Sequence, residues 1–243
     1  VGRVELPGPT AVQRPLEVLD AMGPHDAPAL IWSTVTDTVL VVGRAGRDPI
    51  LNRGVLEARG IPVVNRRSGG GPVLWDRGLL GLDVLVPRAH RLAPADVTLA
   101  YRWLGTAVAE ALTRLGVPAH SIDVATARAA QRRDDEEARL ARVACFGGFS
   151  PFEVVGADGR KLVGLAQVRR RTGTLFQCGI AMDMDVQTLA QVLSSDPQAA
   201  ARRATALDAI TTGVHGTAPG LTTESVMREV EAVLMSRDDI RIG

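Results

Sequence analysis

The sequence predicts an α+β fold with a mixed, largely antiparallel sheet flanked by helices, and two observations support this class. Short apolar runs of strand length fill much of the chain, and the best helical pattern stands alone at residues 95–116. The predicted order is strands, a helix, a run of strands and then helices. A doubly wound sheet would instead alternate strand and helix throughout, so the order favours α+β.

The elements predicted in the first part of the chain are short. Residues 10–23 and 48–60 have helical patterns that stop at Gly23 and Gly60. Apolar runs predict strands before and after the loop S-G-G-G-P. These strands cover residues 29–33, 37–43, 61–67 and 79–87.

The strongest helical pattern, at residues 95–116, ends at Gly116. Its apolar residues recur mostly every three or four positions; they are Val97, Ala100, Tyr101, Leu104, Ala107, Val108 and Leu112. Residues 126–142, in contrast, are highly charged and have no clear apolar face. This pattern predicts a solvated helix or a mobile loop.

The remaining elements are three strands followed by two helices. The strands are predicted at residues 152–155, 161–168 and 173–182, and the helices near residues 186–193 and 221–235. The segment A-D-G-R at 157–160 is a hairpin turn signal of the Asp-Gly type. We see no internal repeat, and we expect a single domain over residues 1–243.

Composition and charge give no reason to expect a membrane or nucleic acid as a partner. The chain has 243 residues, of which 46% are hydrophobic and 23% charged, with a net charge of +1. No apolar run reaches the ~18 residues that a membrane span needs. The first residues, V-G-R-V-E-L-P-G, contain no signal-peptide core, so we expect a cytoplasmic protein.

Cysteine and histidine usage does not predict a metal site. The two cysteines, Cys145 and Cys178, are too far apart in sequence for a C-x-x-C site, although they leave one structural disulfide open. Cys178 lies inside an apolar run and is interpreted as a core or pocket-lining residue. None of the four histidines pairs with another at i, i+4.

Lys161 is the only lysine among the 28 basic residues of the chain. It follows the predicted hairpin turn, where an exposed lysine would be the ordinary interpretation. Arginine occupies every other basic position, however, so an ordinary surface site would also be expected to hold arginine. Lysine can lower its pKa when buried, transfer a proton and act as a compact point charge. We therefore treat Lys161 as a candidate functional residue.

Two further segments could carry chemistry. The segment R-R-S-G-G-G-P-V-L at 66–74 could form an anion-binding nest, with Arg66 or Arg67 as a planar donor, or it could be a plain glycine-rich hairpin. Cys145 is followed by Gly147 and Gly148, which suggest an accessible bend. A nucleophilic thiolate and a buried, inert cysteine both fit this local sequence.

Together these segments resemble the lipoate-protein ligase and octanoyl/lipoyl transferase family, whose catalytic fold is shared with biotin protein ligases. Three blocks carry the resemblance, in the family's order. They are V-L-V-V-G-R-A at 39–45, R-R-S-G-G-G-P-V-L-W-D at 66–76 and G-R-K-L-V-G-L-A-Q-V-R at 159–169. The resemblance extends over residues 30–195 and implies the biotin/lipoate protein ligase type of fold.

The resemblance assigns roles to particular residues. It implies that Lys161 contacts the acyl carbonyl or an acyl-adenylate. A loop over the acyl chain or nucleotide would comprise Arg66, Ser68, Gly69, Gly70 and Gly71. The strand along the pocket would contribute Gly164, Ala166 and Gln167.

Family members use two chemistries, and the resemblance favours the one without ATP. Cys145, followed by Phe146 and eight residues on by Glu153, resembles the cysteine block of octanoyltransferases that form an acyl-thioester. These enzymes require no cofactor beyond the octanoyl or lipoyl group. The alternative is a ligase that activates lipoate with ATP and Mg²⁺, often with an accessory C-terminal domain. We expect no such domain here.

Two positions depart from the family pattern. Trp75 and Cys178 stand where histidine is common, so Trp75 could narrow the acyl tunnel or change its substrate, and a non-catalytic acyl-binding homologue is a third hypothesis. The partners implied are an acyl carrier protein and a lipoyl-domain protein, such as the glycine cleavage H protein or a dehydrogenase E2.

Overall fold

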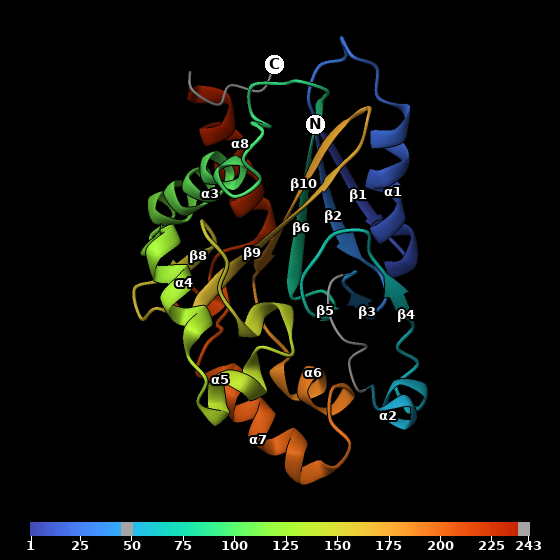
Figure 1. Cartoon of the computed structure of the whole chain (residues 1–243), viewed down its shortest axis with the longest axis vertical. Coiled ribbons are helices and arrows are strands. Elements are labelled where there is room, and N and C mark those ends of the chain that lie inside the picture. Colours follow the sequence, from blue (N-terminus) through green and yellow to red (C-terminus); the bar gives the residue numbers. More distant parts are fainter. Residues whose placement is uncertain (45–50, 238–243) are drawn as a thin grey trace.

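The structure is a computed structural model that describes residues 1–44 and 51–237. Within these residues a seven-stranded sheet forms the middle layer (Figure 1). Its strands, in spatial order, are β1 (Gly2–Leu6), β2 (Ala29–Val35), β6 (Leu79–Pro87), β10 (Gly173–Ala181), β9 (Lys161–Arg169), β8 (Val154–Gly156) and β7 (Ala119–Ser121). Only the β1–β2 pair is parallel, which confirms the mixed, largely antiparallel sheet.

A second sheet of three described strands packs over part of the first. Its order is β4 (Val63–Asn65), β3 (Val39–Val42) and β5 (Val73–Trp75). Apolar side chains of β3 and β5 share one core cluster with Leu79 and Ala181 of the large sheet. The small sheet therefore covers the end of β6 and β10 that carries these two residues.

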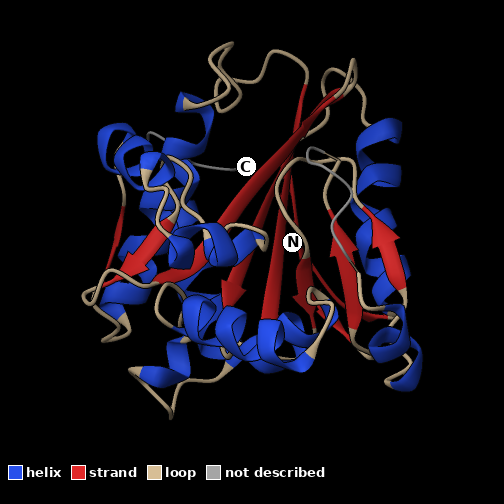
Figure 2. Cartoon of the chain, turned by 60° about the horizontal axis from the view of Figure 1, so that its bottom comes forward, coloured by secondary structure: helices blue, strands red, loops and turns tan. Residues whose placement is uncertain are grey.

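Helices cover both faces of the large sheet (Figure 2). On one face, α3 (Arg102–Arg114) and α8 (Thr223–Ser236) pack on Val84, Val86 and Phe176. On the other face, α1 (Gly8–Ala21) packs on Leu85 and Leu175. The remaining helices are α2 (Arg53–Ala58), α4 (Val124–Arg132), α5 (Glu136–Ala141), α6 (Val186–Val192) and α7 (Pro197–Asp208).

The antiparallel register places three glycines side by side across the long strands. Gly179 of β10 pairs with Gly81 of β6 on one side and with Gly164 of β9 on the other. Because alternate residues of a strand point to opposite faces, all three lie on the face that carries α1 and the small sheet. They leave a shallow space between the two sheets.

Most of the predicted elements are present, with shifted ends. The Asp-Gly hairpin between β8 and β9 is confirmed, and Gly159 adopts a left-handed φ of 78° there. Two predicted features extend beyond the described residues. These are the start of the predicted helix at 48–60 and the last residue of the block at 39–45. The charged segment at 126–142 forms two short helices, α4 and α5.

Four elements were not predicted, namely β1, β5, β7 and α7. The open question of a disulfide is answered, since Cys145 and Cys178 are both free thiols. None of the described helices combines the length and apolar character that crossing a bilayer requires. The prediction of one domain without an accessory domain stays a prediction.

Candidate active site

Cys145 begins a single 3-10 turn, Cys145–Gly147, directly against the glycine-rich loop. Its backbone N–H donates to the carbonyl of Pro72 over 2.8 Å. A Cβ at Gly71 would lie 2.6 Å from the carbonyl oxygen of Val143, and a Cβ at Gly147 would lie 1.8 Å from that of Ala141. Gly71 therefore lets the glycine-rich loop pack closely on the Cys145 segment, and Gly147 lets the turn pack on the end of α5.

Arg66 brings a positive charge to the sulfur of Cys145. One terminal nitrogen of its guanidinium, Nη2, lies 3.5 Å from Sγ and 3.2 Å from the carbonyl oxygen of Gly71. Gly70 has a left-handed φ of 99°, and a Cβ there would lie 2.7 Å from the same nitrogen. The half-buried sulfur thus has a guanidinium N–H donor at hydrogen-bond distance.

Lys161 is buried, with 1% of its surface exposed. Its ammonium lies 2.8 Å from Oε2 of Glu153, and it donates to the carbonyls of Cys145 and Gly148 over 3.0 and 2.9 Å. The ring centroid of Phe146 is 5.2 Å away. The interpretation of an exposed turn lysine is therefore wrong.

The three acceptors around Lys161 change what the residue can do. An ammonium has three protons to donate, and here each has a protein oxygen to bind. In this arrangement Lys161 fixes the turn that carries Cys145, and the contact with an acyl carbonyl stays a prediction.

Glu153 completes this arrangement from the other side. Its carboxylate, 2% exposed, accepts the backbone N–H of Ser150 over 2.7 Å and that of Leu165 over 3.2 Å. The preceding residue, Phe152, has a φ of 68°, which is rare outside glycine. Lys161 and Glu153 together tie residues 145–153 to strand β9.

A narrow apolar cavity of about 70 Å³ extends from Cys145 between the two sheets. Its floor is the row of Gly81, Gly179 and Gly164. A Cβ on Gly81 would lie 2.8 Å from the indole of Trp75, and one on Gly164 would lie 3.4 Å from the ring of Phe146. The indole N–H of Trp75 donates to the Leu79 carbonyl over 3.0 Å, which holds the ring in the wall.

A buried polar group that was not predicted lies at one end of this cavity. The Asp83 carboxyl is 4% exposed, and burial raises its pKa to about 7. Gln177 donates to it over 3.4 Å and accepts the hydroxyl proton of Ser68 over 2.6 Å. The G-L-D-V-L-V sequence indicated only a strand, since nothing in it shows that the aspartate faces a cavity.

The structure brings most of the predicted site residues together. Those bordering the cavities at Cys145 are Arg66, Gly69, Gly70, Gly71, Trp75, Gly164, Ala166 and Cys178. The hydroxyl of Ser68 donates to Gln177, which borders the apolar cavity. Cys178 packs in the core cluster under α3 and α8, and burial raises the pKa of its thiol.

Gln167 is the exception among the predicted residues. Its amide donates to the Val97 carbonyl over 2.7 Å and accepts from Arg169 over 2.9 Å, both near the surface. It holds the segment before α3 and does not border the cavity, because it lies on the strand face opposite to Ala166.

Across residues 1–44 and 51–237, no three His, Cys, Asp or Glu side chains gather in a way that could hold a metal ion. The described site contains a thiol, a guanidinium and an apolar cavity.

Residues 11–234 match the lipoyl protein ligase A/B catalytic domain family. The chain belongs to this family. The resemblance seen in the three sequence blocks is thereby confirmed, and the match covers the small sheet, the large sheet except β1, and the segment that carries Cys145.

Similar proteins agree with membership of the lipoyl protein ligase A/B family. Octanoyltransferase LipM of Kyrpidia tusciae is 35% identical over 168 residues, which cover 67% of this chain and 56% of that protein. LipM of an Exiguobacterium species is 34% identical over 68% of this chain and 57% of its own length. The chain thus spans a little over half the length of these curated relatives.

Solved structures support the fold. The bipartite lipoate protein ligase of Thermoplasma acidophilum, described with its E2 lipoyl domain, has a TM-score of 0.73 at 19% identity. The match covers 96% of this chain and 81% of that one. A biotin protein ligase from Aquifex aeolicus has a TM-score of 0.50 at 12% identity, with 96% and 67% covered. The expected lipoate and biotin ligase type of fold is confirmed.

We predict that Lys161→Met lowers the free energy of unfolding by about 3–5 kcal/mol, because it leaves the Glu153 carboxylate buried without its cation. Urea denaturation measures the change. The control is Arg160→Met, which removes the exposed pair with Asp158 and a 3.5 Å hydrogen bond to the Asp208 carbonyl, and it should change stability by less than about 1 kcal/mol. Equal effects of the two variants would contradict the role given to the pair.

We predict that Asp83 makes the protein less stable as the pH rises from about 4 to about 7. The folded state keeps the Asp83 proton up to about pH 7, whereas the unfolded chain loses it near pH 4. The folded state therefore binds more protons within this window, so its stability falls as the pH rises. Asp83→Asn should remove this part of the pH dependence in urea melts. Parallel stability curves for the two proteins would contradict it.

Proposed function

We propose that this protein transfers an octanoyl or lipoyl group from a carrier thioester to the lysine of a lipoyl-domain protein, through a thioester on Cys145. The observation that supports this most directly is the Cys145 sulfur, 3.5 Å from the Arg66 guanidinium at an apolar cavity. The name octanoyltransferase, carried by the curated relatives, supports the same reaction.

In the first step, the Cys145 thiolate attacks the carbonyl carbon of the donor thioester. A carbon–sulfur bond to Cys145 forms, the bond to the donor sulfur breaks, and the donor leaves as a thiol with the proton that Cys145 gave up. The Arg66 guanidinium lies where it stabilises negative charge on sulfur before the attack. The acyl chain would lie over Gly81, Gly179 and Gly164.

In the second step, the neutral amine of the acceptor lysine attacks the acyl-cysteine. An amide forms, the carbon–sulfur bond breaks, and the Cys145 thiol is regenerated with the proton released by the amine. The net products are an acyl-lysine and a free donor thiol. Splitting the transfer lets each protein partner use the same opening at Cys145 in turn.

The Lys161–Glu153 pair contributes to both steps by holding the backbone of Cys145, without contacting the reacting atoms. Lys161 holds the carbonyl of Cys145 itself, so the ammonium fixes the backbone from which the sulfur extends. Positioning of a nucleophile to within about 1 Å affects the rate strongly. We therefore propose Lys161 as a positioning residue, in place of the direct contact with the acyl group that the family resemblance implies.

The partners follow from the reaction. An acyl carrier protein is the proposed donor, and the glycine cleavage H protein or a dehydrogenase E2 is the proposed acceptor. One solved structure of a similar fold is described together with its E2 lipoyl domain. The cytoplasmic location and the single-domain organisation stay predictions.

A ligase using ATP and Mg²⁺ is the second candidate, and one observation favours it. A large cleft rich in arginine lies beside the glycine loop and could accept the phosphates of a nucleotide. A ligase would release pyrophosphate in the presence of lipoate and ATP, and it would not need Cys145.

We predict that octanoyl carrier protein adds one octanoyl group to the protein, seen by intact mass without ATP. Cys145→Ala should abolish the mass gain, whereas Cys178→Ala, which removes the other thiol, should keep it. Arg66→Gln should slow the acylation roughly 10²-fold, because a charge-stabilising donor is lost.

Other outcomes would point elsewhere. Full transfer activity in Cys145→Ala would contradict the thioester, and lipoate-dependent pyrophosphate release would favour the ligase. Octanoate binding without either reaction would favour the non-catalytic homologue.

We predict that Trp75→Leu shifts the acyl preference toward longer chains. The indole fills the space above Gly81 in a cavity of only about 70 Å³, so a smaller side chain lengthens the cavity. The ratio of kcat/KM for dodecanoyl over octanoyl donors should rise roughly tenfold. Val63→Ala, at an exposed position of β4, is the control and should leave the ratio unchanged. An unaltered ratio in folded Trp75→Leu would contradict the assignment.

A further inference from the structure

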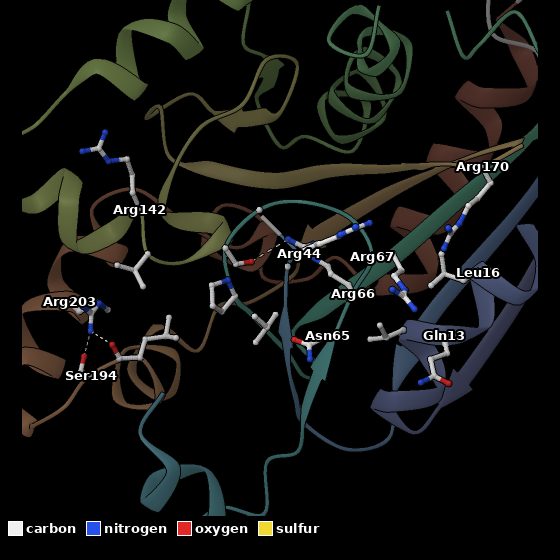
Figure 3. Close-up of a pocket in the computed structure, with 18 of the residues that line it drawn as sticks. Gln13, Leu16, Arg44, Asn65, Arg66, Arg67, Arg142, Arg170, Ser194 and Arg203 are labelled. Carbon is white, nitrogen blue, oxygen red and sulfur yellow. Dashed lines mark hydrogen bonds between the residues drawn. The ribbon is translucent and has the colours of Figure 1, made fainter. Parts of the chain in front are cut away.

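A cleft of about 1150 Å³ opens on the side of the glycine loop away from α3 (Figure 3). It runs from α1, past the ends of β3 and β4, to α6 and α7. Among the described residues that line it, arginines far outnumber carboxylates. The lining arginines are Arg44, Arg66, Arg67, Arg142, Arg170 and Arg203, and the lining carboxylates are Glu17 and Asp20.

The outer arginines already have protein partners. Arg203 donates to Leu193 and Ser194, and Arg142 donates to the carbonyls of Ala138 and Gln131. Arg170 faces Asp20 at 3.8 Å. Their charge contributes to the field of the cleft, but most of their donors are in use.

The central arginines are different. Figure 3 shows Arg44, Arg66 and Arg67 gathered in the middle of the cleft. Within residues 1–44 and 51–237, no partner is bonded to the side chain of Arg44 or of Arg67. The Nε of Arg66 is buried and also lacks a hydrogen-bond partner in this part of the chain. Such a concentration of unmatched guanidinium donors favours an anion.

The cleft is continuous with the site at Cys145. Gly70, Gly71 and Arg142 line both the cleft and a second cavity of about 390 Å³ that Cys145 also borders. Arg66 lines the cleft and contacts the sulfur. A ligand that extends from the cleft can therefore present its end to Sγ. The neutral side-chain amides of Gln13 and Asn65 also line the cleft (Figure 3).

These features define a ligand with a particular shape. It has a compact anion for the central guanidinium groups, which suit the oxygens of a phosphate. It has a flexible arm with amide groups that runs to the sulfur. The concave shape fits such an arm better than the convex acidic surface of a folded protein.

We propose that the arginine cleft binds the phosphate of a phosphopantetheine arm, and so holds the acyl donor by its own prosthetic group while the thioester reaches Cys145. This inference rests on the proposed transferase function. Coenzyme A and acyl carrier proteins both bear this phosphate, so the cleft recognises what the two donors share.

The experiment compares octanoyl thioesters that differ only in the phosphate. Acylation of Cys145 is followed by intact mass with octanoyl-pantetheine and octanoyl-4′-phosphopantetheine at low ionic strength, and then with octanoyl-coenzyme A and octanoyl carrier protein. The wild-type protein should react at least tenfold faster with octanoyl-4′-phosphopantetheine than with octanoyl-pantetheine when both donors are below saturation. The double variant Arg44→Gln/Arg67→Gln should lower this ratio at least fivefold.

A matched control keeps the result specific. Arg228 is exposed on α8, far along the chain from the cleft lining, and pairs only with Glu224 among its described contacts. Arg228→Gln removes one arginine charge and should keep the wild-type ratio. Faster acylation by octanoyl carrier protein than by octanoyl-coenzyme A would show that the carrier protein makes further contacts besides those of the shared phosphate.

Clear results would overturn the proposal. Equal rates with the two pantetheine donors, or a variant whose two rates fall together at a constant ratio, would show that the phosphate is not recognised. Acylation by at least one thioester would still support the proposed function in that case. A protein that no thioester acylates would overturn both.

Discussion

The buried ion pair between Lys161 and Glu153 is the interaction on which the rest of the site depends. Removing two charges from water is costly, and the cost is offset only when every donor and acceptor is satisfied. Here the ammonium binds two carbonyls besides the carboxylate, and the carboxylate accepts two backbone N–H groups. The pair therefore holds residues 145–153 in one conformation against β9, and that conformation places the sulfur.

The glycines of the site follow from this constraint. Once the turn at Cys145 is fixed, the glycine-rich loop has to pass it at backbone distance, and a Cβ at Gly71 would contact the backbone at 2.6 Å. The paired strands show the same effect, since Gly81, Gly179 and Gly164 lie in register and leave space beside Trp75 and Phe146 for the proposed acyl chain. The apolar cavity and the nucleophile are thus positioned by the same close packing of backbone.

Sequence patterns predicted the continuous apolar strands best, since β6 covers the same residues, 79–87, that were predicted. They missed β1 and β7, short strands at the edges of the sheet that are only partly buried. They also missed α7, whose buried side is mostly alanine, although Asp196 and Pro197 form a recognisable helix start. The proximity of Arg66 to Cys145 and the burial of Asp83 arise from tertiary packing, which no local pattern encodes.

The lone lysine illustrates how composition and geometry combine. Around Lys161, three oxygens from three residues surround one nitrogen at 2.8–3.0 Å inside the core. A compact ammonium fits such a space, whereas a planar guanidinium spreads its donors over a wider fork and needs more room. In the proposed phosphate site of the cleft, the ligand would be an anion approached from one side, and a planar guanidinium suits that geometry. Lysine thus stands where a small charge is enclosed by protein oxygens, a position that the wider guanidinium fits poorly.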